Sequence, residues 1–149
     1  MKSIFNAAHA QEYIGRINKL TPQSQALWGK MNVSQMLAHC QQPLRVALGE
    51  LKLKRGLMGI LFGSWAKKKL TGPEEFSKNM PTDKSFLVKD ERSFEKEKEG
   101  LINLINRFNQ GGVAALTREP HPFFGSMTPE QWDILQSKHL DHHLKQFGA

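Results

Sequence analysis

The chain has 149 residues, a formal net charge of +7, 39% hydrophobic residues and 23% charged residues. This length predicts one domain spanning residues 1–149 with a sizeable core, and the composition excludes a chain that is disordered throughout. The pI near 9.7 favours anionic partners in general, without choosing among nucleic acid, acidic lipid and small anionic substrates.

Cysteine content and hydropathy indicate the compartment. Cys40 is the only cysteine, so the chain forms no internal disulfide and no CxxC motif, which suits a reducing cytoplasm. The N-terminal segment has no continuous apolar stretch and does not resemble a signal peptide. The longest weakly polar run, residues 56–66, is far shorter than the roughly 20 residues of a spanning helix. We therefore expect a cytoplasmic protein without a transmembrane segment.

Helical periodicity predicts five helical segments and no strand of comparable quality. The first covers about residues 6–20 and ends at a Thr-Pro turn signal. The second starts at Asn32, a good N-cap, with Gln35 at capping-box spacing. Pro43 lies inside this helix and cannot donate to the carbonyl of His39, so we expect a kink one turn after that histidine.

The second half of the chain contains the other three helical segments. Three glycines weaken the third, residues 53–70, and residues 71–90 form a long loop that is expected to be functional or mobile. The fourth helix follows Ser93 and carries an apolar face of Phe94, Leu101, Leu104, Ile105 and Phe108. Thr128 caps the last helix, with Pro129 at its first position and Gln131 at capping-box spacing. These elements predict an all-α fold, namely an antiparallel four-helix bundle with an extra short helix and a long loop.

Two histidines on the last helix are the clearest candidates for chemistry. His139 and His143 lie four residues apart, so both rings point the same way, on the inward stripe that includes Trp132 and Leu135. Burying an unpaired polar group costs roughly 1–3 kcal/mol, and a divalent metal would engage one nitrogen of each ring. The alternative is that the rings line a wet end of the bundle and bind water.

The remaining histidines and the cysteine give weaker signals. His39 lies to one side of its helix's apolar stripe, so spacing alone indicates a boundary residue. His142 falls toward the edge of its stripe, His121 is expected to order the loop before the last helix, and His9 is expected to be exposed or at the boundary. Cys40 is expected to be a small buried hydrophobe. Further candidates for a cleft wall are Trp28, Gln35, Gln136 and Gln146.

Two segments, WGKMNVSQMLAHC and HLDHHLKQFG, resemble the signature segments of the DinB/YfiT-like superfamily. The intervening KNMPTD and HPFFGSMTPEQW look like a branch of it known mainly as a domain of unknown function. The resemblance implies a four-helix bundle whose divalent metal is bound by His39, His139 and His143, with the adjacent His142 not a ligand. Zinc is the expected ion, although nickel, cobalt or iron would suit three imidazoles nearly as well. Members of known activity are metal-dependent transferases or isomerases that use low-molecular-weight thiols, but no thiol-binding motif can be matched here.

Three functional hypotheses remain. The first is a metal-dependent thiol transferase or hydrolase that activates a thiol or water against an unknown small substrate, with no general base evident. The second is binding of a small ligand, nucleic acid or a membrane surface without catalysis, through a basic face in residues 51–70. A solvated edge is the simpler interpretation of that face, so nucleic acid is not expected as a partner. The third is a metal-dependent or ligand-sequestering homodimer without turnover, joined through an apolar surface of the same segment.

Overall fold

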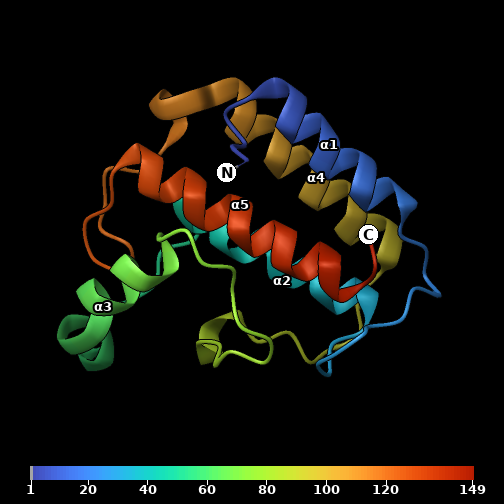
Figure 1. Ribbon diagram of the computed structural model, residues 1–149, viewed down its shortest axis with the longest axis horizontal. Coiled ribbons are helices and arrows are strands. Elements are labelled where there is room, and N and C mark those ends of the chain that lie inside the picture. The colour runs from blue at the N-terminus through green and yellow to red at the C-terminus, as the bar shows by residue number, and fades with distance from the viewer. Residues whose placement is uncertain (1) are drawn as a thin grey trace.

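The computed structural model describes residues 2–149, and the regular structure of these residues is helical. Its five α-helices and two short 3₁₀ turns confirm the predicted all-α class. None of the helices within the described range is long and apolar enough to cross a membrane. In chain order the elements are α1 (Ala7–Lys19), α2 (Val33–Ala47), α3 (Leu57–Leu70), η1 (Lys84–Phe86), α4 (Phe94–Gly111), η2 (Gly112–Ala115) and α5 (Pro129–Gln146) (Figure 1).

Both predicted capping boxes are present, and they set the start of the two helices that carry the candidate site. The Asn32 side chain accepts from the amide of Gln35, whose own side chain accepts from the amide of Asn32. Thr128 and Gln131 form the same reciprocal pair at the start of α5. The caps fix where each helix begins, and the helical period decides which side chains share a face. The helical path of α2 continues through Pro43.

Four helices pack on one another around the core: α2 contacts α4 and α5, and α1 contacts the same two. Helix α1 runs antiparallel to α4, because Asn109 near the end of α4 donates to the carbonyl of Ile4 just before α1. Helix α1 runs parallel to α5, since the Tyr13 hydroxyl donates to the carbonyl of Ser137 and Arg16 pairs with Asp141. The apolar face predicted for α4 is buried in this core.

Helix α2 runs antiparallel to α5 and parallel to α4. The end of α5 lies beside the chain just before α2, where Gln146 donates to the carbonyl of Trp28. The end of α2 lies beside the segment after α4, where the Thr117 amide donates to the carbonyl of Ala47. Parallel neighbours require a long crossover connection. Residues 48–93 provide it, and they carry α3 and the predicted 71–90 loop past α2 and α5 (Figure 1).

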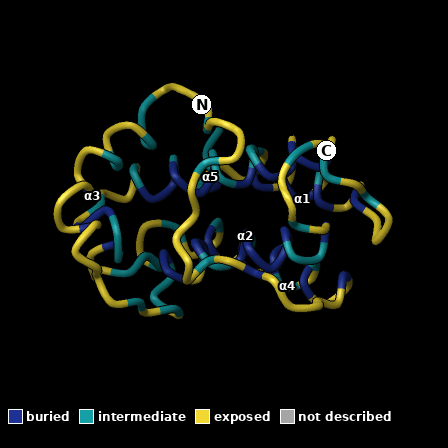
Figure 2. The backbone as a smooth tube through the Cα atoms, turned by 90° about the horizontal axis from the view of Figure 1, so that it is seen from below, coloured by how far each residue is buried: buried dark blue, intermediate teal, exposed yellow. Residues whose placement is uncertain are grey.

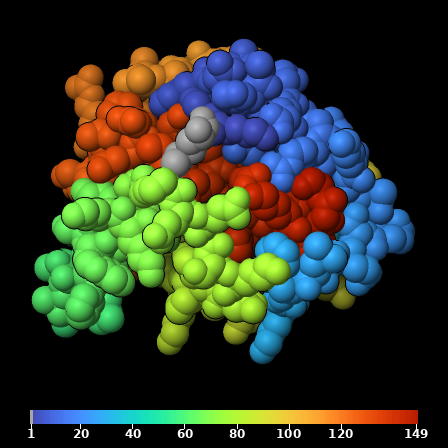
Figure 3. Space-filling model, in the orientation of Figure 1, coloured from blue at the N-terminus to red at the C-terminus, as the bar shows by residue number. Residues whose placement is uncertain are grey.

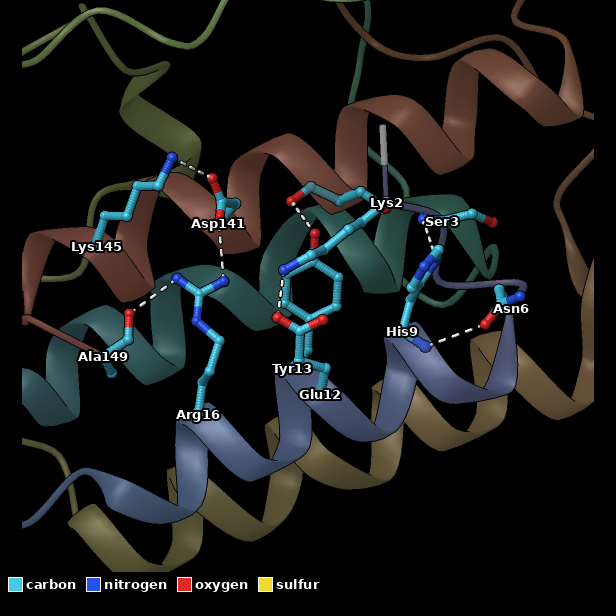
Figure 4. A network of polar contacts seen from close by, with 11 residues as sticks. Lys2, Ser3, Asn6, His9, Glu12, Tyr13, Arg16, Asp141, Lys145 and Ala149 are labelled. Carbon is cyan, nitrogen blue, oxygen red and sulfur yellow. Dashed lines mark hydrogen bonds and ion pairs between the residues drawn. The ribbon is translucent and has the colours of Figure 1, made fainter.

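A polar seam holds α1 against α5 (Figure 4). Arg16 Nη1 donates to Asp141 Oδ1 at 2.7 Å, and Nη2 donates to the carbonyl of Ala149 at 2.9 Å. Burial raises the pKa of the Tyr13 hydroxyl to about 12, which keeps it a neutral donor to Ser137. His9 accepts from the Ser3 amide and is partly exposed, as predicted for a boundary residue. The seam fixes the rotation of α5, and therefore the direction of its inward histidines.

Candidate metal centre

Three histidines from two helices meet between α2 and α5. His39 comes from α2, and His139 and His143 come from α5, so the structure brings together all three predicted ligand residues. One nitrogen of each ring lies within 4.8 Å of the other two. His39 Nε2 and His139 Nε2 are 3.0 Å apart, and the ring centroids are 4.6–4.8 Å apart. The three imidazoles lie close enough to hold one metal ion.

The outer nitrogens of two rings are already bonded, which fixes where their protons lie. His39 Nδ1 is 2.8 Å from the carbonyl oxygen of Phe86. A carbonyl oxygen cannot donate, so this nitrogen carries the proton and the Nε2 lone pair is free. His143 Nδ1 is 2.8 Å from Gln146 Oε1, and the Nε2 of that glutamine donates to the carbonyl of Trp28. The glutamine orientation is thereby set, and His143 also keeps its Nε2 lone pair free.

Burial keeps the three rings neutral. Burial is the main cause that lowers the pKa of His39, against a smaller opposing effect of its bond to Phe86. Burial, with added repulsion from His143 and His39, holds the pKa of His139 well below its usual value. Burial also lowers the pKa of His143 to about 3. Neutral imidazole is the form that binds a metal, so the site needs no deprotonation at neutral pH.

The donor set fits a divalent transition metal. Zinc–nitrogen bonds of about 2.0–2.1 Å at tetrahedral angles place two ligand nitrogens about 3.3 Å apart. The 3.0 Å between His39 Nε2 and His139 Nε2 is near that value, and the third ring lies within the 4.8 Å limit. Three imidazoles leave one position of a tetrahedron open, as in catalytic rather than structural zinc sites.

His142 lies outside this cluster, as predicted, and its ring sits on the adjacent face of α5. Its ring contacts Trp28 and Phe76, with centroids 5.7 and 6.0 Å apart. It lines a cavity of about 620 Å³ that also receives Lys78 and Lys138 from the loop and from α5. None of the three clustered histidines lines this cavity. His142 therefore lies between the cavity and the site, with its ring centroid 5.1 Å from that of His143.

His121 and Cys40 have the structural roles that the sequence predicted for them. His121 Nδ1 accepts from the amides of Phe123 and Phe124 at 3.0 and 3.1 Å, which confirms that it orders the loop before α5. Cys40 is 1% exposed with its Sγ 3.7 Å from Met36 Sδ, and burial raises the pKa of its thiol. It is a buried structural residue, as predicted, and not a reactive thiolate.

Two features of the site could not be read from the sequence. His39 is buried and not at the boundary, because the 71–90 loop covers it and Phe86 supplies the carbonyl. A backbone carbonyl in an irregular loop leaves no sequence signal. Gln146 was a candidate for the cleft wall, but it instead bonds His143. Its position three residues after His143 is the signal that could have indicated this contact.

The contact between Gln146 and His143 gives a testable consequence. We expect Gln146→Leu to weaken metal affinity by about 10–100-fold, because removing an outer-shell acceptor frees the ring to rotate. Gln146→Glu should keep the affinity, because a carboxylate accepts from His143 even better. Both variants lose the donation to Trp28, so they differ only in the acceptor and in the charge of the carboxylate. Competition with a chromophoric chelator measures the affinity, and equal losses in both variants would show that the His143 contact is not the cause.

Comparison with known families identifies the family to which the chain belongs. The family model described as "Protein of unknown function (DUF1569)" matches residues 5–149, so the chain belongs to this family. No curated protein and no solved structure matches the chain. The match includes both histidine segments, but the family description assigns them no chemistry.

Proposed function

We propose that the protein is a DinB-like metal-dependent enzyme that holds one divalent ion through His39, His139 and His143. The packing of α1, α2, α4 and α5 would then be the DinB-like bundle. One observation carries the proposal: the outer nitrogens of His39 and His143 donate to fixed carbonyl oxygens. Their free lone pairs are thereby oriented before any ion arrives, which is the outer-shell arrangement of metal-binding histidines.

The chemistry of such a site is activation of a small nucleophile. A divalent ion held by the three histidines would supply a lowered pKa to a thiol or water and so a nucleophile at neutral pH. The chain's contribution is to keep the three rings neutral by burial and to hold two of them in place through Phe86 and Gln146. Zinc is the default ion, with nickel, cobalt or iron as alternatives that three imidazoles also accept.

The cavity beside His142 is the place we assign to the part of the substrate that is not attacked, because none of the three ligand histidines lines it. Its aromatic walls, Trp28 and Phe76, suit the apolar part of a small molecule. Four lysines and three carboxylates also line it, and two of these lysines, Lys78 and Lys138, lie against the aromatic rings and suit an anionic group. Lys78 lies 4.5 Å from the Trp28 ring centroid and Lys138 lies 4.9 Å from that of Phe76. The ring contact places the Lys78 ammonium at the cavity wall, and Lys138 is held there also by donating to the carbonyls of Leu70 and Gly72.

Metal analysis of untagged protein tests the proposal most directly, since a polyhistidine tag would add its own metal. We expect one equivalent of metal per chain after purification or after loading with zinc. The loaded protein is then screened with low-molecular-weight thiols and small electrophiles, where product should form only with metal present. Less than about one tenth of an equivalent with each of zinc, nickel, cobalt and iron would refute the metal site. One equivalent without turnover would refute the enzyme and favour a protein that only holds metal.

A further inference from the structure

Helix α3 presents large apolar side chains to solvent. Six of the nine exposed large hydrophobic residues within residues 2–149 belong to it, and each is 49–69% exposed: Leu57, Met58, Ile60, Leu61, Phe62 and Trp65. The helix lies at one end of the molecule, away from α1, and most of its residues are exposed (Figures 1 and 2). A soluble monomer rarely exposes so many large apolar groups together, so this face marks an interaction site.

The outward direction of these side chains is built into the helix. Gly59 and Gly63 are its buried residues, and both face the backbone of residues 122–124. A Cβ at position 63 would lie 2.1 Å from the carbonyl oxygen of Phe123, and one at position 59 would lie 2.9 Å from it. Only glycine permits so close an approach. The helix therefore turns its glycines toward the protein, which leaves the opposite face for the bulky residues.

Basic residues flank this apolar face on both sides. Lys52, Lys54 and Arg55 precede it, Lys67, Lys68 and Lys69 follow it, and no acidic residue occurs between Glu50 and Glu74. Some of these cations have partners in the structure: Lys52 pairs with Glu119, and Lys67 donates to the carbonyl of Ser126. Lys68 and Lys69 are exposed at the end of the helix, and Lys69 lies 5.6 Å from the Trp65 ring centroid. The partner must therefore offer both an apolar interior and negative charge.

We propose that α3 docks the protein on a lipid bilayer that contains anionic phospholipids, with the helix lying in the interfacial region. Lipid tails accept the apolar side chains, and the anionic headgroups neutralise the lysines. Nucleic acid would satisfy the lysines alone, because its phosphate backbone does not cover six large apolar groups. A second copy of the chain would cover the apolar groups but bring two positive patches together. Helix α3 has 14 residues and projects from the molecular surface, so it can reach the interface while the rest of the fold is unchanged (Figure 3).

Vesicle co-sedimentation tests the apolar part of this proposal. The wild-type protein is expected to bind vesicles of phosphatidylcholine with about one third phosphatidylglycerol. The double variant Leu61→Ser/Trp65→Ser should bind at least about tenfold more weakly, because two anchors no longer enter the bilayer. A matched control changes two exposed apolar residues outside α3, Leu87→Ser/Val113→Ser. This control should bind like the wild type, and an equal loss in both double variants would overturn the proposal.

The charge requirement is tested by a second pair of variants. Lys68→Glu/Lys69→Glu should reduce binding at least about 30-fold, since each lysine near an anionic surface contributes roughly fivefold and each is here reversed in charge. Lys30→Glu/Lys96→Glu makes the same change of net charge at exposed positions outside α3 and should retain binding. Pure phosphatidylcholine vesicles should bind the wild type much more weakly. Equal losses in both variants would show that overall charge, and not α3, drives the association.

Tryptophan fluorescence reports where the contact lies. Vesicles should shift the wild-type emission to shorter wavelength, because Trp65 passes from water into the interface. Trp28→Phe should keep this shift and Trp65→Phe should lose it. Two other results would overturn the proposal in favour of another partner. One is a lipid-independent dimer that Leu61→Ser/Trp65→Ser dissolves, and the other is duplex DNA binding that vesicles do not displace and that Lys68→Glu/Lys69→Glu abolishes.

Discussion

His139→Ala and His143→Ala are each expected to abolish stoichiometric metal binding while the helical content largely survives. Each substitution removes one of three nitrogens that lie within 4.8 Å of one another, and no other described Cys, Asp, Glu or His belongs to the cluster. Loss of an outer-shell partner alone costs about 10–100-fold in affinity, so loss of a ligand should cost more than about 100-fold. Metal content after dialysis and far-ultraviolet circular dichroism measure the two outcomes.

The same variants should lose the stabilisation that metal gives to the folded state. A ligand that binds only the native protein adds about 2.7 kcal/mol to the free energy of unfolding at 100 times its dissociation constant. Zinc at that excess should therefore stabilise the wild type and leave both variants nearly unchanged. His142→Ala is the matched control, since it removes a neighbouring imidazole that lies outside the cluster. If both ligand variants retain full metal, the site assignment is wrong and the rings only bond one another and water.

The part of the site on α5 was predictable because it depends on helical periodicity. Spacing of four residues puts His139 and His143 on one face, and the capping box at Thr128 fixes where that periodicity begins. The same local signals predicted the five helical segments and the buried face of α4. What periodicity cannot provide is the direction of one helix relative to another, which depends on the crossover of residues 48–93.

The burial of His39 on α2 could not be predicted from the spacing of residues in that helix. His39 lies beside the apolar stripe of its own helix, so burial could not be inferred from α2 alone. The cover comes from a loop nearly 50 residues later, through the carbonyl of Phe86. Only the family resemblance pointed to His39 as a partner of the other two. Long-range pairing through a backbone atom leaves no pattern in the side chains, which is why no spacing rule could predict it.

Helix α3 was predicted less clearly for a different reason, which is its glycine content. Its glycines lowered the expectation of a helix, yet they are the residues that let it pack closely on residues 122–124. Glycine has a low helix propensity, whereas at Gly59 and Gly63 the absence of a Cβ atom permits close packing. The sequence favoured a solvated basic edge here. The structure adds that the apolar residues of this segment are also exposed.

The metal-free protein is expected to lose stability as the pH falls from about 6.5 to about 4, in part through His121. Burial lowers the pKa of this ring to about 4 from an ordinary value of 6.5, against a small opposing effect of Asp83. The unfolded chain therefore binds a proton in this window that the folded chain does not. Each pH unit then costs about 1.4 kcal/mol per such proton, so the full window costs about 3 kcal/mol. Above pH 6.5 the contribution is constant.

His121→Asn isolates this contribution, because an amide oxygen can still accept from the amides of Phe123 and Phe124 but does not titrate in this range. The free energy of unfolding is measured with urea from pH 7.5 to pH 4, with chelator present. It should depend less steeply on pH in the variant, and the difference in slope should correspond to at most one proton. The variant should also be less stable than the wild type by a constant amount at every pH, since the His121 ring stacks on Phe124 and lies against Trp132. The constant difference in stability measures the lost packing, and the difference in slope measures the proton that His121 binds on unfolding. Parallel plots of stability against pH for the two proteins would show that His121 does not titrate with folding. The remaining histidines are common to both proteins and cancel in the difference.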